Sequence, residues 1–366
     1  MKYLFGLIIL IHGVIHILGF LKAFSLAEIN SLTLYINKFQ GIAWLVSGLI
    51  LIAYLILYLS HNPFSWLVGV VAVIVSQLLI IYFWKDAKFG SIPNALILIL
   101  AIVSYGQFSF NRLVQRETTS LINSVHISPD RSVSEDDLGK LPEPVKRWLQ
   151  NSGMIGKRYI MLGKVIQRAE MKMKPEQQKW LDASAVQYTA IDLPAFIWSV
   201  DVKMNGLMFF LGRDKFEGGK GEMLIKLNAL LNVVNEHGEK LNEGTIQRYL
   251  GEMVWFPSLA LSEYISWEQV NDTTAKAIMQ YKGTKGSGTF RFNSNGDFVS
   301  FSAMRYMGNE IESSRYEWVM LVEEYKTFDG IKVPSKMSAT WKLDEGDWTW
   351  LKLEVTDIKY NENCIR

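Results

Sequence analysis

Arg248, Glu252 and Arg305 are the charged residues whose types and spacing could build a binding site. Arg248 and Glu252 are four positions apart, so on a helix they share one face and can form an ion pair. Arg305 ends the apolar row of a predicted strand, which predicts either the rim of a concave sheet face or a pairing with an acid such as Glu252. As a site, the three would contact the polar head of an apolar ligand. As structure, they would orient a helix on a sheet.

His12 and His16 form a second pair, four positions apart in the first apolar segment. Ionisable residues at membrane depth indicate function, so a proton relay or a quinone contact is one interpretation. The alternative is that both rings are neutral and hydrogen-bonded to Gln77 or Gln107. Bis-histidine haem ligation is not expected, because the other apolar segments contribute no facing histidine, and His61 lies in a turn.

The sequence lacks the patterns of common catalytic sites. His126 and His237 are far apart, and no HExxH or paired CxxC pattern would hold zinc. No serine lies in a G-x-S-x-G elbow, and Gly286–Gly288 is predicted to be a hairpin turn. The glycine-rich run 216–221 lacks phosphate-loop spacing and predicts a bulged turn. No catalytic residue, metal ligand or cofactor is therefore predicted, and binding is favoured over catalysis.

The stretch Gly244–Leu261 is the element that must position the charged set. Its apolar residues recur with the period of a helix and form one stripe: Ile246, Tyr249, Leu250, Met253 and Val254. Pro257 is expected to end the helix, and the helix is expected to lie on one face of a sheet. Its predicted ligand contacts, besides the charged set, are Tyr249, Met253, Trp255 and Phe256. Packing in a core is the alternative for the two aromatic residues at 255 and 256.

Composition divides the 366 residues into an apolar front part and a near-neutral back part. Residues 1–116 contain seven Lys or Arg and two acids, whereas the remainder holds 31 basic and 34 acidic residues. Nucleic-acid binding is disfavoured because it selects for basic surfaces. The single cysteine, Cys364, excludes internal disulfides.

Four apolar segments are each long enough to cross a bilayer: Leu4–Leu21, Phe39–Leu59, Phe64–Trp84 and Ile92–Phe110. They predict a four-helix transmembrane domain over residues 1–111. Retention of the first segment is favoured over cleavage as a signal peptide, because its apolar run is longer than usual for a signal peptide and contains two histidines. This architecture resembles DoxX-like membrane proteins, a likeness that transfers no residue.

The lysines of the front part favour one orientation. With the amino terminus outside, the inside loops carry Lys22, Lys38, Lys85 and Lys88, against three basic residues for the opposite orientation. The sequence therefore predicts a multi-pass protein of the bacterial inner membrane, with the back part outside the cytoplasm.

The back part predicts a connector with a short helix over residues 112–140 and an antiparallel β domain over 141–366. Twelve segments have strand patterns: Tyr159–Met173, Asp182–Ala190, Ala195–Met204, Met208–Phe216, Gly221–Leu227, Ile265–Val270, Ala275–Tyr281, Gly288–Phe292, Phe298–Tyr306, Tyr316–Tyr325, Val333–Lys342 and Trp350–Lys359. Asn235–Glu239 is predicted to be a turn, and Val299, Phe301 and Ala303 are predicted to share a face. The fold class is α+β, with a strongly curved meander and a central helix on one face.

Several motifs resemble an uncharacterised bacterial domain family over roughly residues 140–362: Leu141-Pro-Glu-Pro-Val-Lys-Arg-Trp-Leu, Phe216-Glu-Gly-Gly-Lys-Gly-Glu-Met, Arg248-Tyr-Leu-Gly-Glu-Met-Val-Trp-Phe-Pro-Ser-Leu-Ala-Leu and Arg305-Tyr306. The layout is similar to lipoprotein-carrier domains of the LolA/LolB kind. That resemblance implies a half-barrel around helices that holds acyl chains, without residue-for-residue correspondence.

Three function classes follow. The first is a membrane-anchored extracytoplasmic module that binds a lipid or acyl chain. The second is a membrane oxidoreductase-like or proton- or quinone-linked protein that uses His12 and His16. The third is an envelope scaffold or sensor that binds a protein partner through a sheet edge. The bilayer and a lipid ligand are the predicted partners of the first class.

Overall fold

The computed structural model describes residues 1–127 and 131–364. The chain divides into two compact units. Met1–Arg112 with Asn228–Leu230 form the first, which we call the helical unit. Leu113–Leu227 with Leu231–Arg366 form the second, the sheet unit.

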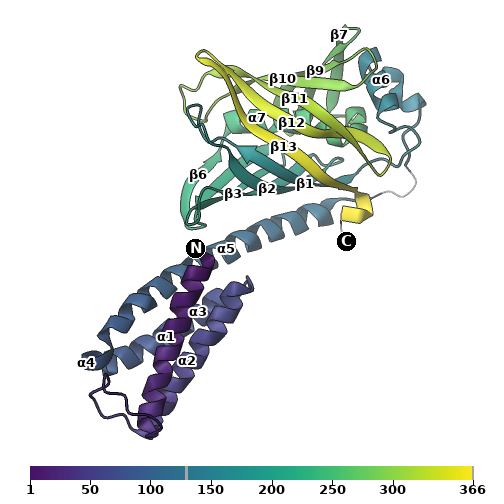
Figure 1. Ribbon diagram of the computed structural model, residues 1–366. Coiled ribbons are helices and arrows are strands. Elements are labelled where there is room, and N and C mark those ends of the chain that lie inside the picture. Colours follow the sequence, from purple (N-terminus) through teal and green to yellow (C-terminus); the bar gives the residue numbers. More distant parts are fainter. Residues whose placement is uncertain (128–130, 365–366) are drawn as a thin grey trace. The chain divides into compact units, whose positions relative to one another are not determined.

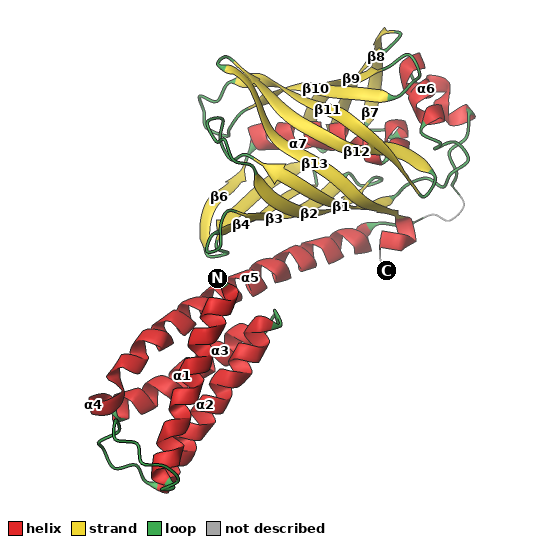
Figure 2. Cartoon of the chain, in the orientation of Figure 1, coloured by secondary structure: helices red, strands yellow, loops and turns green. Residues whose placement is uncertain are grey.

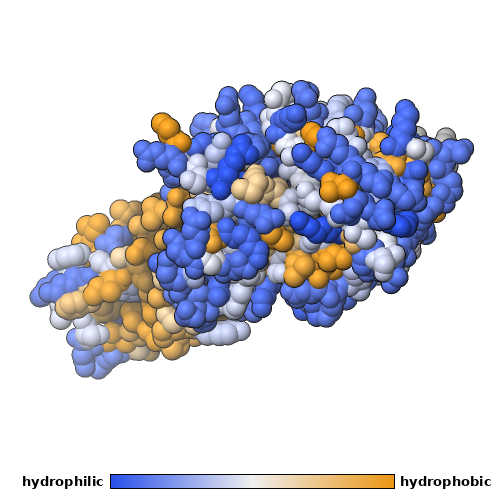
Figure 3. Space-filling model, turned by 90° about the horizontal axis from the view of Figure 1, so that it is seen from above, coloured by the Kyte–Doolittle hydropathy of each residue, from blue (hydrophilic) through white to orange (hydrophobic). Residues whose placement is uncertain are grey.

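The helical unit consists of helices joined by loops (Figure 1). Their bounds are α1 Lys2–Ala23, α2 Lys38–Leu59, α3 Ser65–Tyr82, α4 Trp84–Ala87, the 3₁₀ turn η1 Lys88–Gly90, and α5 Ser91–Ser124, which continues into the sheet unit. Four helical segments are long and apolar enough to cross a membrane. In Figure 3 hydrophobic surface gathers over this unit, whereas the visible face of the sheet unit is mostly hydrophilic.

Glycines let α1 and α2 approach closely, as small residues do between membrane helices. A Cβ at Gly48 would lie 2.9 Å from the carbonyl oxygen of Gly13, and one at Gly19 would overlap the Trp44 ring. The start of α2 is fixed by a reciprocal capping box between Asn37 and Gln40.

The sheet unit is one antiparallel meander that curves around a helix (Figure 2). Its strands are β1 Leu162–Met171, β2 Leu181–Ala190, β3 Ala195–Lys203, β4 Phe209–Glu217, β5 Lys220–Leu227, β6 Leu231–His237, β7 Ile265–Asn271, β8 Thr274–Tyr281, β9 Thr284–Phe292, β10 Phe298–Tyr306, β11 Arg315–Phe328, β12 Ile331–Leu343 and β13 Gly346–Tyr360. The order is β6-β5-β4-β3-β2-β1-β13-β12-β11-β10-β9-β8-β7. The sheet is not closed, and β6 and β7 form its edges. The predicted α+β class with a curved antiparallel sheet is confirmed.

Three local expectations were wrong. Asn235–His237 is not a turn but the end of β6, paired with β5. Gly286–Gly288 lies inside β9 and pairs with β8. Glycine stands at 288 because the Phe301 ring occupies the space that a side chain would need. Val299 does not share the buried face of Phe301: a register shift between Phe298 and Ser300 leaves it exposed.

The helix on the concave side is α7, Glu239–Gly251, followed by the 3₁₀ turns η3 Glu252–Trp255 and η4 Pro257–Leu261. It starts five residues earlier than Gly244 and gives way to tighter turns before Pro257. It lies against β4, β5 and β8–β10.

Smaller helices complete the unit: η2 Asp136–Lys140, α6 Glu143–Asn151 and η5 Asn361–Cys364. Gly153 follows α6 with a φ of 75°, the left-handed conformation expected after a helix end. The last part of α5 packs with the outer side of the sheet, where Arg213 Nε lies 3.1 Å from Glu117 Oε2.

Candidate ligand-binding site on the concave face

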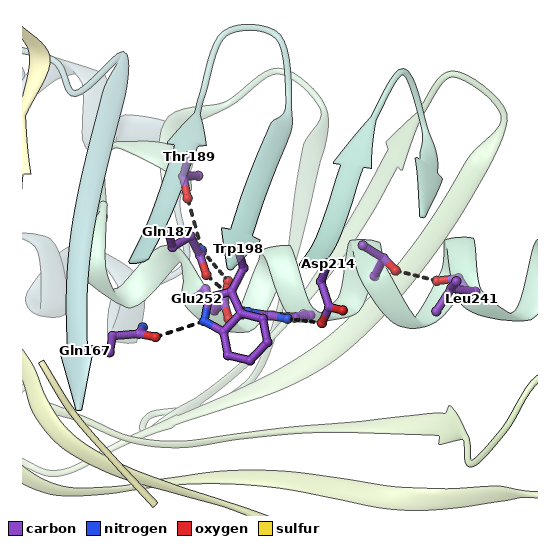
Figure 4. Close-up of polar contacts among 9 residues, drawn as sticks. Gln167, Gln187, Thr189, Trp198, Asp214, Leu241 and Glu252 are labelled. Atoms are coloured by element: carbon purple, nitrogen blue, oxygen red, sulfur yellow. Dashed lines mark hydrogen bonds and ion pairs between the residues drawn. The ribbon is translucent and has the colours of Figure 1, made fainter. Parts of the chain in front are cut away.

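Arg248 is the centre of a polar network between α7 and the strands. Figure 4 shows Gln187, Asp214 and Glu252, three members of this network. Its Nε donates to Glu252 Oε1 at 2.7 Å, its Nη1 to Asp214 Oδ2 at 2.6 Å, and its Nη2 to Gln187 Oε1 at 3.1 Å. The guanidinium also lies 4.9 Å and 4.8 Å from the ring centroids of Phe196 and Trp198. All three nitrogens of Arg248 are therefore engaged within the protein.

The network continues into the sheet. Gln187 Nε2 donates to Glu252 Oε2 at 2.7 Å and to Thr189 Oγ1 at 3.1 Å. Trp198 Nε1 donates to Gln167 Oε1 at 3.0 Å. Both oxygens of Glu252 are thus bonded, so this cluster is a satisfied buried network.

The charges of the network support one another. Burial opposes the charge on Arg248, but Glu252 and Asp214 outweigh it and raise the Arg248 pKa. Burial raises the pKa of Asp214, an effect that Arg248 opposes. Through these contacts, Arg248 and Glu252 hold the end of α7 against Gln187 of β2 and Asp214 of β4.

Arg305 lies on β10 and has a different environment. Its guanidinium carbon is 4.3 Å from the ring centroid of Trp318 and 5.7 Å from that of Trp341. A Cβ at Gly244 would come within 3.2 Å of Nη2, so the guanidinium reaches the first half of α7. Its Nε is buried without a hydrogen-bond partner among the described residues. Burial, and then repulsion from Arg248, lower the Arg305 pKa to about 10, so it stays cationic at neutral pH.

The predicted apolar contacts Tyr249, Met253, Trp255 and Phe256 lie in the packed core of the sheet unit, each no more than 1% exposed. Tyr249 donates its hydroxyl to the Ala190 carbonyl at 2.8 Å, and Trp255 Nε1 donates to the Pro334 carbonyl at 3.1 Å. Phe256 fills the space beside Gly163. Together these residues hold the α7–η4 segment against the sheet.

Sequence reasoning missed another set of inward-facing residues. They pack against the core but are only partly buried, and we call them the hairpin-end group: Ala183, Met204, Phe210, Trp341, Leu351 and Leu353. They lie toward the end of the sheet that carries the β1–β2, β3–β4 and β12–β13 turns. Leu353 pairs with Ala169 and Leu351 with Met171, on the face that carries Gln167. The alternation of side chains along each strand could have assigned these residues to the inner face of the sheet. It does not show which end of the sheet α7 covers, so it could not predict that they stay partly exposed.

The histidines of the helical unit form a second polar cluster. His12 Nε2 lies 2.9 Å from Asn94 Oδ1 and 3.3 Å from Ser76 Oγ, and Asn94 Nδ2 donates to Gln77 Oε1 at 3.0 Å. His16 Nδ1 lies 2.9 Å from the His12 carbonyl oxygen. The predicted link to Gln77 therefore runs through Asn94.

One ring nitrogen of His16 lacks a hydrogen-bond partner within the described part of the chain. Its Nε2 is buried without a partner among the described residues, as is Nε1 of Trp44, whose ring centroid is 5.2 Å away. Among the residues that the structure describes, no group of three His, Cys, Asp or Glu could hold a metal ion.

The family match falls within the sheet unit. A model described as "Family of unknown function (DUF6544)" matches residues 131–353. A LolA superfamily protein from Nitrosomonas europaea is similar in structure, with 8% identity, a TM-score of 0.32, and coverage of 62% of this chain and 91% of that chain. A β-barrel-like protein of the DUF1849 family from Brucella abortus has 7% identity, a TM-score of 0.20, and coverage of 56% and 99%. No curated protein matches the chain.

Proposed function

We propose that this chain, which belongs to the family of unknown function DUF6544, binds a hydrophobic ligand such as a lipid or acyl chain on the concave face of its sheet unit. The observation that carries the proposal is the hairpin-end group. Apolar inward-facing side chains are normally fully buried in a sheet that wraps a helix, yet these six stay partly exposed. An apolar ligand that covered them would be stabilised by about 25 cal/mol per Å² of buried apolar area.

The helical unit would hold this module at a membrane. Four of its helical segments are long and apolar enough to span a bilayer, and they expose many large hydrophobic side chains. With the amino terminus outside, Lys22, Lys38, Lys85 and Lys88 lie on the cytoplasmic side, and the sheet unit lies outside the cytoplasm of a bacterial inner membrane. Cysteine-accessibility labelling of the Cys364→Ser chain with single cysteines at exposed Leu26 and Ile311 tests this orientation: Leu26 should be protected in intact cells and Ile311 labelled.

Photocrosslinking tests ligand binding. A diazirine-bearing fatty acid is added to the full chain in amphipol, and labelled peptides are mapped by mass spectrometry. Label is expected on peptides that carry Phe210 and Leu353, and excess unlabelled fatty acid should remove it. Label confined to α1–α5, or label that excess fatty acid does not displace, would contradict the proposal.

A substitution that adds bulk to the hairpin-end group sharpens the test. Ala183→Trp should lower fatty-acid labelling because the indole would occupy part of the apolar surface. Leu321→Gln, at a side chain that is 46% exposed, is the matched control and should label like the parent chain.

A second candidate function is proton or quinone chemistry at His16, favoured by its buried, unpartnered Nε2 beside Trp44. A quinone carbonyl would accept a hydrogen bond from this nitrogen if the tautomer carried its proton there. A photoreactive quinone should then label α1 or α2 of the parent chain and not of His16→Phe. Equal labelling of both chains would exclude this function.

A further inference from the structure

We propose that Arg305 binds the anionic head group, a carboxylate or phosphate, of the hydrophobic ligand, so that the ligand is an acidic amphiphile. This inference rests on the proposed function and adds the chemical class of the ligand. It assigns Arg305 the role of head-group contact and leaves Arg248 and Glu252 as supports of α7.

The first step is the contrast between the two arginines. Arg248 donates from all three nitrogens to Glu252, Asp214 and Gln187. Arg305 has no ion pair or hydrogen bond among the described residues, and its buried Nε is unsatisfied. A buried cationic donor without a partner is costly, and an anion with two oxygens can satisfy several guanidinium donors at once.

The second step concerns the acids near Arg305. Glu252 and Asp214 act on its charge at a distance, so the two arginines and two acids balance formally. Both carboxylates, however, hydrogen-bond to Arg248. Charge balance without hydrogen bonds leaves the donors of Arg305 available, and it disfavours a cationic ligand beside two guanidinium groups.

The third step is the surface next to Arg305. The guanidinium stacks near Trp318 and Trp341, and Trp341 belongs to the hairpin-end group. Stacking on aromatic rings holds the plane of an arginine while its edge stays free for a planar or tetrahedral anion. A ligand with its head on Arg305 would therefore continue onto apolar side chains, which is the arrangement that an acidic amphiphile needs.

The test is a competition assay with the full chain in amphipol. A fluorescent fatty acid is displaced by myristate, by methyl myristate, and separately by inorganic phosphate. The parent chain is expected to prefer myristate to its methyl ester by about tenfold, the scale of one charge-assisted hydrogen bond. Arg305→Gln should lose this preference and still bind the ester, whereas Arg305→Lys should keep part of it.

Arg291→Gln is the matched control, because Arg291 is an exposed cation of β9 that bonds only to Ser302 among the described residues. It should retain the preference. Equal affinity of the parent chain for acid and ester would overturn the inference while the proposed function stands. Absence of binding to both would overturn the proposed function itself. Displacement by inorganic phosphate alone, without myristate binding, would show a free-anion site and contradict an amphiphile.

Discussion

The Arg248 guanidinium and the Glu252 carboxylate are joined at 2.7 Å across the point where α7 ends and the 3₁₀ turn η3 begins. Arg248 lies in the last turn of the α-helix, which ends at Gly251, and Glu252 is the first residue of the tighter turn. Because Gln187 of β2 bonds to both side chains, the pair fixes the geometry of the helix end and its position on the sheet. Removal of one member of such a buried pair leaves the other charge uncompensated.

Substitution Arg248→Met is expected to destabilise the chain by about 3–5 kcal/mol, because Glu252 and Asp214 lose their cation. Thermal unfolding in amphipol, followed by tryptophan fluorescence, measures the effect. Arg291→Met serves as the control at an exposed cation. Equal melting temperatures for the two variants would contradict the supporting role of Arg248.

Substitution Gly163→Ala is expected to cost about 1–3 kcal/mol, because the new Cβ would overlap the ring of Phe256 inside the core. Gly139→Ala is the matched change, since a Cβ there meets no atom within 4 Å. The same melting experiment compares them. A neutral Gly163→Ala would mean that the η3–η4 segment can move away from β1.

Cys364 is expected to resist alkylation in the folded chain. Burial raises its pKa from 9.0 to about 12, and its Sγ donates to the Lys359 carbonyl at 3.1 Å. At pH 8 the thiolate fraction is then lower than in the unfolded chain by a factor on the order of 10³. Iodoacetamide labelling with and without denaturant measures this difference.

The same difference in the Cys364 pKa makes the free energy of unfolding depend on pH. The folded-state pKa lies above the unfolded value, so the thiol contributes stability that is complete below pH 9 and is lost as pH rises toward 12. Rapid labelling of the folded chain at pH 8 would show that Cys364 is accessible and its pKa unshifted.

His12→Leu is expected to destabilise the helical unit by about 1 kcal/mol, because Asn94 and Ser76 lose their hydrogen bonds to the ring. His16→Leu should cost less, because the His16 ring loses only its local Nδ1 contact with the His12 carbonyl oxygen, and its Nε2 has no partner among the described residues. Thermal unfolding in lipid nanodiscs compares the melting temperatures of the two variants. A larger loss of stability for His16→Leu than for His12→Leu would contradict this prediction and would mean that the His16 ring makes a further stabilising contact.

Much of the fold follows from local patterns. Phe290 and Phe292 alternate with exposed Arg291 as the period of a strand requires, and Gly153 marks a helix end. The edge strand β6 was missed because Asn235–His237 is polar and precedes a glycine, a composition shared by turns and by solvent-facing edges. The domain bounds at 111 and 140 stay predictions.

The polar site was predicted in part. The i, i+4 spacing of Arg248 and Glu252 gives their pairing, but Asp214 and Gln187 come from strands far away in sequence. Only the register of the sheet brings them together, and no local pattern encodes that register. For the same reason, whether Trp255 lies in a core or lines a ligand depends on which end of the sheet α7 covers.

The pairing of β1 with β13 sets an order of events for folding. Neighbouring strands of the described sheet are consecutive in the chain, with one exception. β1 pairs with β13, for example through Gly163 and Tyr360. Hairpins of the first six strands can form during synthesis, but the pairing of β1 with β13 must wait until β13 has left the ribosome. Until then β1 and β12 present unpaired edges. Premature termination within β13 would therefore leave two half-sheets with unpaired edge strands, which are prone to aggregation, rather than a slightly shortened domain.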